Sequence, residues 1–221
     1  MTLRLVIGNK NYSSWSMRPW LAMRAAKIPF DEEVILLDDP TFKARVGALG
    51  SGKVPVLLDG DLAIWESLAI LEYLAEKFPA AGLWPVEPVV RGKARAVAAE
   101  MHAGFVHLRR QLPMNMRRPV RQRELSPEAK MDVSRIETIW TDCHKNAGGP
   151  FLFGKFGAAD AMFAPVVSRF HTYAVDVNAT ARSYMEAVMA LPAWRDWLEG
   201  ALAETAVLPE DEVDWPAVLR P

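Results

Sequence analysis

The sequence predicts an α/β domain followed by an all-helical domain, and three observations support this fold class. Strand-length apolar runs alternate with helix-period segments over residues 1–80. A stretch rich in proline, alanine and glycine then interrupts the pattern. Residues 88–221 contain almost only helix-period segments. We therefore expect two domains, at 1–80 and 88–221, joined by a linker at 81–87.

The first domain is expected to begin with a strand, a helix and a second strand. Leu3–Ile7 is an apolar run typical of a buried strand. The helix is expected at Arg18–Lys27, with Pro19 in its first turn, where a missing N–H costs little. The second strand is expected at Glu33–Leu37, and the residues after it show no regular pattern.

A hairpin and a helix complete this domain. Val54–Leu58 and Leu62–Trp65 flank an Asp-Gly turn, which is typical of a β-hairpin. Ser67–Phe78 follows with apolar residues at helical spacing. This order predicts helices packed on a small mixed sheet.

The second domain is predicted to contain only helices. Ser126 is a suitable N-cap before a proline and a glutamate, and a Gly-Gly-Pro stop follows at 148–150. The expected helices are Pro88–Leu112, Ser126–Ala147, Ala158–Tyr173, Thr180–Ala190 and Ala193–Ala203.

The composition excludes several classes of protein. The chain has 221 residues, of which 51% are hydrophobic, with 26 Lys and Arg against 27 Asp and Glu. This balance argues against nucleic acid or a membrane surface as a partner, because phosphate recognition needs a cationic excess. One cysteine, Cys143, allows no internal disulfide, and His102 and His107 do not share a helix face, so we expect no metal. No signal peptide or membrane-spanning run is recognisable, so we expect a soluble, cytoplasmic protein.

The loop before the first predicted helix contains three hydroxyl side chains, those of Ser13, Ser14 and Ser16. A helix N-terminus exposes unpaired N–H groups and a partial positive charge, so it stabilises anions. The loop could therefore bind an anionic ligand. The alternative is that one serine caps the helix and the others are solvated.

Two dipeptides further along the chain favour the same kind of ligand. The Val54–Pro55 bond is either simple punctuation at a strand end or a cis bond that turns the backbone toward an extended peptide. Glu66 and Ser67 either cap a helix or receive the ammonium and carboxylate groups of a ligand. The three features together indicate an extended, zwitterionic peptide with a thiol.

These motifs resemble those of the glutathione S-transferases over essentially the whole chain. They are Ser-Ser-x-Ser-x-Arg at 13–18, Lys-Val-Pro-Val-Leu at 53–57 and Glu-Ser-Leu-Ala-Ile-Leu-Glu-Tyr-Leu at 66–74, followed by an all-helical half. The first loop is most similar to that of the zeta class, the maleylacetoacetate isomerases. The resemblance implies a thioredoxin-like first domain, glutathione as co-substrate, a small electrophile as second substrate, and a homodimer.

The resemblance also implies roles for individual residues. Ser13 matches the serine that activates the glutathione sulfur. The implied glutathione-binding residues are Ser13, Ser14, Arg18, Lys53, Val54, Pro55, Glu66 and Ser67, with Glu66 and Ser67 at the γ-glutamyl end and Lys53 near the glycyl carboxylate. The electrophile is expected beside Trp15, His102, Phe105, Arg109 and Met114. Gly154, Ala159 and Asp160 match a folding motif of the family.

The sequence departs from the family pattern at two of these places. Trp15 replaces the cysteine of the zeta-class loop, and Gly157 stands where a helix-capping Ser or Thr is usual. Three activities therefore stay open: glutathione transfer, a glutathione-dependent isomerisation, and binding without catalysis. A run of arginines from Arg109 to Arg123 is either a solvated surface or an electrostatic funnel for acidic substrates.

Overall fold

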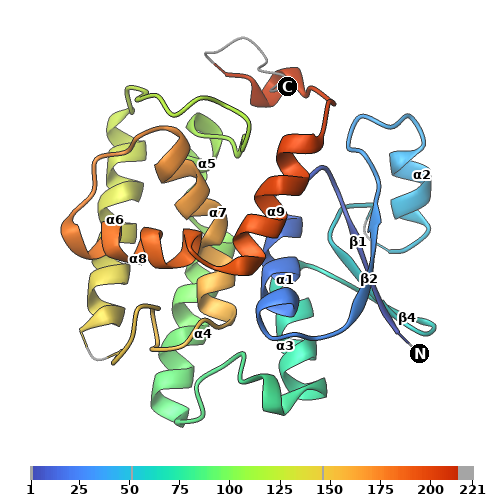
Figure 1. Cartoon of the computed structure of the whole chain (residues 1–221), viewed down its shortest axis with the longest axis horizontal. Coiled ribbons are helices and arrows are strands. Elements are labelled where there is room, and N and C mark those ends of the chain that lie inside the picture. Colours follow the sequence, from blue (N-terminus) through green and yellow to red (C-terminus); the bar gives the residue numbers. More distant parts are fainter. Residues whose placement is uncertain (1, 51, 146, 214–221) are drawn as a thin grey trace.

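The computed structural model describes residues 2–50, 52–145 and 147–213, and it confirms the expected fold class. A four-stranded sheet with helices α1–α3 forms the N-terminal part, and helices α4–α9 form the C-terminal part (Figure 1). None of the helices in the described ranges is long and apolar enough to span a bilayer.

The sheet is mixed, with the order β2-β1-β3-β4. The central strand β1 (Leu3–Ile7) runs parallel to β2 (Phe30–Val34) and antiparallel to β3 (Val56–Asp59). The strand β4 (Leu62–Trp65) forms the predicted hairpin with β3. The parallel pair is connected through the helix α1 (Ser14–Ala25), as a strand–helix–strand unit requires.

The second strand lies three residues earlier than predicted, because it is an edge strand with a polar sequence. β2 reads Phe-Asp-Glu-Glu-Val, and its register pairs Leu3 with Phe30 and Ile7 with Val34. The apolar run that suggested a strand at 33–37 continues past the end of β2. Its residue Ile35 is buried in a small cluster with Val6, Val46 and Val56 instead of extending the strand.

The first helix begins four residues before the predicted start. Ser13 is the N-cap of α1 and Ser14 is its first residue, so the serine loop is in fact the first helical turn. Pro19 consequently lies in the helix interior, which corrects its predicted place in the first turn. A short helix, α2 (Phe42–Gly47), occupies the segment that was predicted to be irregular, and α3 (Ser67–Lys77) lies where expected.

The long helix predicted at 88–112 is two helices, α4 (Pro88–Ala103) and α5 (Val106–Gln111). Phe105 between them has a left-handed backbone with φ 58°, which no helix interior allows. A Cβ on Gly104 would lie 2.8 Å from the Glu100 carbonyl oxygen, so the turn needs glycine there. Apolar spacing continues across this break, and periodicity alone therefore does not reveal it.

The remaining helices agree with the sequence to within a few residues. Ser126 caps its helix as predicted, since its Oγ accepts a hydrogen bond from the Ala129 N–H at 3.2 Å. The helices are α6 (Pro127–His144), α7 (Ala158–Thr172), α8 (Ala179–Met189) and α9 (Pro192–Ala203), with short 3-10 turns at Pro79–Ala81 (η1) and Pro209–Asp211 (η2).

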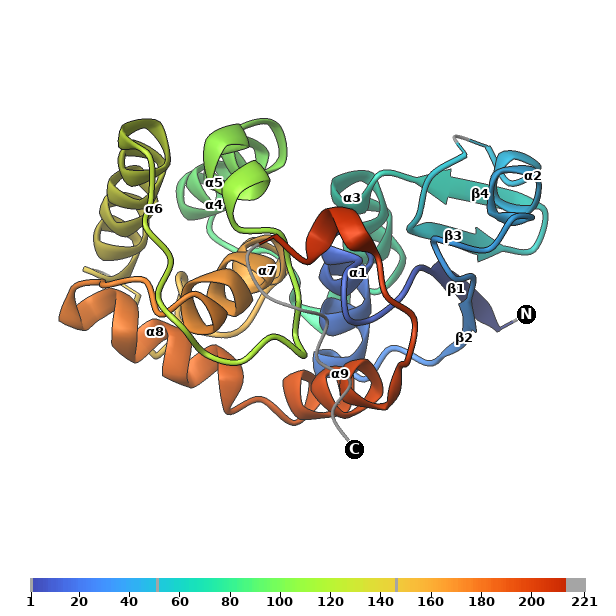
Figure 2. The same ribbon diagram turned by 90° about the horizontal axis from the view of Figure 1, so that it is seen from above.

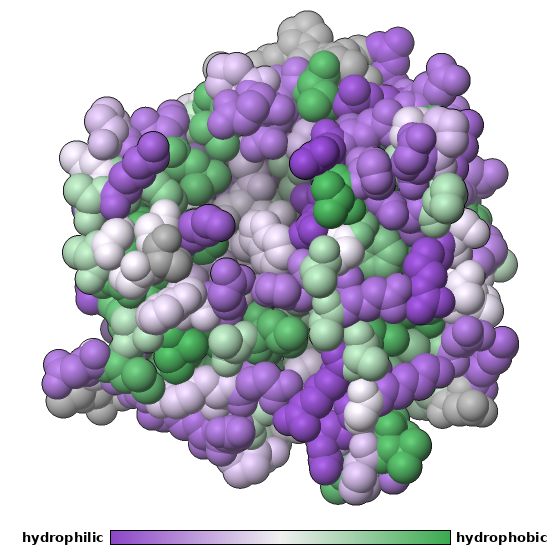
Figure 3. Space-filling model, turned by 180° about the vertical axis from the view of Figure 1, so that it is seen from behind, coloured by the Kyte–Doolittle hydropathy of each residue, from purple (hydrophilic) through white to green (hydrophobic). Residues whose placement is uncertain are grey.

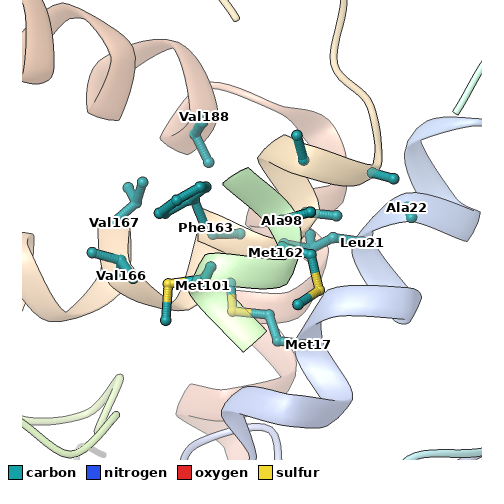
Figure 4. Packing of buried hydrophobic residues seen from close by; sticks show 14 of the residues in the cluster. Met17, Leu21, Ala22, Ala98, Met101, Met162, Phe163, Val166, Val167 and Val188 are labelled. Carbon is teal, nitrogen blue, oxygen red and sulfur yellow. The ribbon is translucent and has the colours of Figure 1, made fainter. Parts of the chain in front are cut away.

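One hydrophobic core runs through both parts of the molecule. Met17 and Leu21 of α1 pack with Met101 of α4 and with Met162 and Phe163 of α7, and all five are fully buried (Figure 4). Burial of such a side chain contributes about 1.5–3 kcal/mol to folding. The N-terminus of α1 is thereby fixed against the helical part.

The C-terminal segment is tied back to the loop between β1 and α1. The Glu204 carboxylate accepts hydrogen bonds from the backbone N–H groups of Lys10 and Asn11 at 2.6 and 2.9 Å. Arg117 donates to the carbonyl oxygens of Glu204 and Ala206. Figure 1 shows η2 beyond the end of α9, and Figure 2 views the molecule from the end at which η2 lies.

Candidate active site

A cavity of about 140 Å³ lies where the N-termini of α1 and α3 meet the start of β3. Figure 3 shows the molecule from behind, and its surface is hollowed between the sheet and the helical part, with hydrophilic side chains at the rim. The residues that line the cavity are Trp15, Lys53, Val54, Pro55, Glu66 and Ser67. Each of them was predicted to be a site residue from the sequence.

Larger cavities lie elsewhere: two of about 470 and 460 Å³ beside α6 and under the linker, and two of about 450 and 280 Å³ beside α7. None of them is lined by the serine loop, by Val54 and Pro55 or by Glu66 and Ser67, and the cavity under the linker is lined by residues of the folding motif around Asp160. The smaller cavity is the candidate site because backbone, charged and hydroxyl groups from three different elements converge there.

The Val54–Pro55 bond is cis, which is the second of the two interpretations that the sequence allowed. Pro55 is buried and begins the turn into β3, whereas Val54 is half-buried and lines the cavity. Val54 precedes β3 and is not paired with a neighbouring strand among the described residues. Its backbone N–H and C=O groups can therefore bind a ligand in the cavity.

Glu66 and Ser67 form the second wall of the cavity. Glu66 has a left-handed backbone with φ 68°, a conformation that costs a non-glycine residue about 1–2 kcal/mol. Such conformations are concentrated at functional sites. Ser67, which is 1% exposed, is the first residue of α3, whose first N–H groups have no acceptor within the helix. The Oγ of Ser67 lies 3.8 Å from the Met162 sulfur.

The serines at the start of α1 lie beside this cavity but do not line it. Ser13 is 7% exposed, and its hydroxyl donates a hydrogen bond to the Ser16 hydroxyl at 2.7 Å. The Ser16 oxygen also accepts from the Gly8 N–H at 3.2 Å. Ser14 is 8% exposed, and its hydroxyl has no hydrogen-bond partner among the described residues. Both serines therefore lie at the start of α1, and Ser13 is already engaged by Ser16.

Trp15 connects the cavity with a group of positive charges. The guanidinium carbon of Arg18 lies 3.8 Å from the centroid of the Trp15 ring, and that of Arg109 lies 5.2 Å from it. The His102 ring meets the same indole edge-on at 5.2 Å. Nε2 of His102 lies 3.6 Å from a carboxylate oxygen of Glu66. Three of the five predicted electrophile-site residues are thus brought together.

The pKa values of this group are shifted by burial and by like charge. Burial, followed by the charges of Arg169 and Arg109, lowers the pKa of Arg18 well below its usual value, and Glu66 acts in the opposite direction. Burial also lowers the pKa of His102 against the opposing effect of Glu66. His102 is therefore neutral near pH 7 and adds no charge to the group.

The other two predicted electrophile-site residues lie in the core. Phe105 is 7% exposed and Met114 is 1% exposed, and both belong to the hydrophobic cluster shared by the two parts of the molecule. Neither lines the cavity.

The arginine run is not a solvated face as a whole, contrary to the simpler interpretation. Arg117 and Arg118 are 2% and 3% exposed, and both donate to backbone carbonyl groups. Arg110 and Arg121 are exposed. Only Arg109 of this run lies against Trp15.

Sequence reasoning missed Arg169, which lies on α7 and shifts the pKa of Arg18. It is 4% exposed and donates to the carbonyl oxygens of Leu112 and Pro165 at 2.7 and 3.2 Å. An available signal was a single arginine in an otherwise apolar helical stretch, because a charge is rarely buried there without a reason.

The family folding motif is formed on α7. Asp160 accepts hydrogen bonds from the N–H groups of Gly157 and Leu152 at 2.9 and 3.0 Å, and burial raises its pKa to about 6. Gly157 has no side chain to cap the helix. The next N–H, that of Ala158, is accepted instead by the Leu83 carbonyl oxygen at 2.8 Å. The linker therefore supplies an acceptor at the start of α7, where the usual capping side chain is absent.

The sheet, the cis-proline and the two-part architecture define a member of the glutathione S-transferase family. Residues 12–77 match the family model of the glutathione S-transferase N-terminal domain, and residues 92–200 match that of the C-terminal domain. The chain belongs to this family.

Individual relatives in the family differ in their described activities. A stringent starvation protein A homolog from Pasteurella multocida is 29% identical over 157 residues, which is 70% of each chain. A dichloromethane dehalogenase from Methylophilus leisingeri is 40% identical over 62 residues, 26% of this chain and 22% of the relative. A probable maleylacetoacetate isomerase from Caenorhabditis elegans is 31% identical over 94 residues, 42% of this chain and 44% of the relative.

Solved structures share the fold at low sequence identity. A glutathione S-transferase from the Antarctic clam Laternula elliptica superimposes with a TM-score of 0.71 at 20% identity, covering 97% of this chain and 99% of that one. A zeta-class maleyl pyruvate isomerase gives 0.70 at 21% identity, covering 92% and 100%. At these identities the likeness concerns the fold alone.

Proposed function

We propose that the protein is a glutathione transferase, which binds glutathione in the cavity at the N-terminus of α1 and activates its thiol for attack on a small electrophile. The observation that carries this proposal is the composition of the cavity wall. A backbone edge at Val54, a carboxylate at Glu66 and a cation at Lys53 face one space. These groups match an extended peptide with an ammonium group at one end and a carboxylate at the other.

In this proposal each part of glutathione has its own subsite. The γ-glutamyl ammonium binds the Glu66 carboxylate, and the γ-glutamyl carboxylate binds at Ser67, where the N-terminus of α3 supplies N–H donors. The cysteinyl backbone pairs with Val54 next to the cis bond. Lys53, which is exposed, reaches the glycyl carboxylate. The thiol then lies near the N-terminus of α1.

The site provides enough stabilisation for a thiolate near neutral pH. A free cysteine thiol has a pKa of about 8.5. A helix N-terminus contributes about 0.5–1 kcal/mol, and a hydrogen bond to a charged group about 1.5–3 kcal/mol. Together these lower the thiol pKa by roughly 1.5–3 units at about 1.4 kcal/mol per unit. Sulfur then attacks the electrophilic carbon, and the leaving group departs with its bonding electron pair.

We assign the hydrogen bond to sulfur to Ser13, with Ser14 as the competing residue. To donate to sulfur, the Ser13 hydroxyl must turn away from Ser16. The Ser16 oxygen keeps its hydrogen bond from the Gly8 N–H, so this turn leaves no buried N–H unpaired. Ser14 needs no such exchange, because its hydroxyl has no partner among the described residues.

Binding without catalysis is the second candidate function, and the Ser13–Ser16 hydrogen bond favours it. A hydroxyl that stays on Ser16 cannot donate to sulfur, and glutathione would then bind without activation. A glutathione-dependent isomerase, the third possibility, would return glutathione unchanged after each turnover. The relative named as a maleylacetoacetate isomerase supports this possibility over less than half of the chain.

Calorimetry with glutathione, followed by turnover of a panel of electrophiles, tests the proposal. We expect saturable binding and a thioether product with at least one electrophile. Binding without any product would favour the second candidate, and an isomerised product with glutathione recovered would favour the third. Absence of glutathione binding would contradict all three.

A further inference from the structure

Arg18 is a fully buried guanidinium group without a hydrogen-bond partner. Its exposed fraction is 0%, and Nε and both Nη atoms lack a partner among the described residues. A buried charge is normally paired, because leaving it unpaired costs several kcal/mol. Its stacking on Trp15 at 3.8 Å offsets part of that cost.

The neighbourhood of Arg18 is positive rather than neutral. Arg169 and Arg109 both lower the pKa of Arg18, and Glu66 is the only acidic group among the described residues that acts to raise it. Glu66 also faces His102 at 3.6 Å and is committed to the ammonium group in the proposed glutathione complex. Little negative charge therefore remains for Arg18 when glutathione is bound.

Arg109 is the arginine of this group that a ligand can reach. It is half-buried, it lies 5.2 Å from the Trp15 ring, and no described residue accepts a hydrogen bond from it. Arg169 is held by two carbonyl groups, and its charge is attracted to Asp211 on η2. Arg109 is attracted to Asp132 on α6. Its five N–H donors are otherwise unused.

Trp15 brings these charges to the glutathione cavity. The indole ring lines the cavity and also contacts Arg18, Arg109 and His102. The field of a buried charge is weakly screened, so Arg18 and Arg169 act on any group next to Trp15. An anion bound to Arg109 is therefore attracted by all three guanidinium groups, although it does not enter the buried region.

We propose that the second substrate carries a carboxylate, which Arg109 binds beside Trp15 with the charges of Arg18 and Arg169 behind it. This inference rests on the proposed glutathione transferase function. The aromatic ring of Trp15 gives the rest of the electrophile an apolar surface next to the thiolate. The class of substrate is therefore a small acidic electrophile rather than a neutral one.

A chlorodinitrobenzoate and its methyl ester test the proposal, since they differ in charge but share the reacting carbon. In both, the glutathione sulfur bonds to the ring carbon that carries chlorine, and chloride leaves with the bonding pair. We expect a higher kcat/KM for the benzoate. In Arg109→Gln this value should fall by about 10- to 100-fold for the benzoate and by less than about twofold for the ester.

Arg110→Gln is the matched control, because Arg110 is the next residue on α5 and is exposed. It should change neither rate by more than about twofold, as expected for an exposed charge. Equal losses for both electrophiles in Arg109→Gln would overturn the proposal, as would a preference of the unaltered protein for the ester.

Calorimetry with the benzoate alone separates this inference from the proposed function. If the benzoate binds and Arg109→Gln abolishes binding while no thioether forms, the anion site stands and the transferase proposal fails. If the ester is turned over but the benzoate does not bind, the transferase proposal stands and the anion site is wrong.

Discussion

The hydroxyl of Ser13 donates a hydrogen bond to the hydroxyl of Ser16 across 2.7 Å, at the first turn of α1. Because Ser16 also accepts from the Gly8 N–H, its oxygen is already satisfied without Ser13. The Ser16 oxygen would therefore keep a hydrogen bond if the Ser13 hydroxyl turned away. This arrangement fits a donor that changes partner when a thiolate arrives.

The Ser13→Ala variant should bind glutathione but activate it poorly. Losing the hydrogen bond should raise the pKa of the bound thiol by about one to two units, from about 1.5–3 kcal/mol. Turnover near neutral pH should fall and partly recover at higher pH. The measurement is the thiolate absorbance of bound glutathione, titrated in Ser13→Ala and Ser14→Ala. A shift in Ser14→Ala alone would assign the role to Ser14.

Glu66→Ala should weaken glutathione binding by about tenfold or more, since the ammonium group loses a charged partner. His102→Ala should change the affinity less, because His102 is neutral and contacts glutathione only through Glu66 in the proposed complex. Calorimetry on both variants makes the comparison. Unaltered affinity in Glu66→Ala would show that the γ-glutamyl end binds elsewhere.

Arg18→Met should stabilise the protein while weakening its use of acidic electrophiles. Replacing an unpaired buried charge with an apolar side chain of similar length should raise the free energy of unfolding by about 1–3 kcal/mol. Arg117→Met is the matched control, since Arg117 is equally buried but donates to the carbonyl groups of Glu204 and Ala206. It should lower stability by about 3–5 kcal/mol. Denaturant titration measures both, and a destabilised Arg18→Met would contradict the prediction.

Asp160 should make the protein lose stability as the pH rises from about 4 to about 6, because burial raises its pKa from 3.8 to about 6. The folded state then binds the proton more tightly than the unfolded state, so this contribution is complete below the unfolded pKa. It falls by about 3 kcal/mol as the pH passes the folded pKa. Asp160→Asn should be less stable overall and should lack this slope. Chemical unfolding across the range compares the two proteins, and parallel curves would contradict the assignment.

The protein should be a homodimer in sedimentation experiments at micromolar concentration. The family resemblance motivates this prediction, and apolar side chains are exposed at the start of α4, where Val86 is 90% and Val89 is 80% exposed. Val89→Asp should therefore favour the monomer. Met131→Asp on α6 is the control, because Met131 is 71% exposed on a different helix. A monomeric unaltered protein would contradict the prediction.

The sequence was sufficient to predict the elements whose pattern is local. The hairpin at β3–β4 and the helix α3 follow from alternation, an Asp-Gly turn and helical spacing. The polar edge strand β2 was misplaced by three residues, because its position depends on pairing with β1, and the left-handed Phe105 was missed, because it depends on one backbone angle. The start of α1 was also misplaced, by four residues.

The residues that line the candidate site could be predicted from the sequence, but the group of buried positive charges beside it could not. Val54, Glu66 and Ser67 belong to motifs that are contiguous in sequence, so they could be found before the structure. The relation between Arg18 and Arg169 depends on the packing of α1 against α7, which are far apart in the chain. No local sequence pattern indicates that two guanidinium groups share one buried region. The burial of Arg18 also depends on tertiary packing and could not be predicted from the sequence.

The hydrogen bonds from the N–H groups of Lys10 and Asn11 to the Glu204 carboxylate determine which part of the fold can be completed first during translation. The ribosome makes the loop that leads into α1 well before it makes Glu204, so its two N–H groups receive their acceptor only after 193 or more further residues have been added. The loop between β1 and α1 is therefore complete only after α9 has been synthesised. A ribosome that stalls before Glu204 would release a chain whose sheet can form but whose loop at Lys10 and Asn11 lacks its carboxylate acceptor.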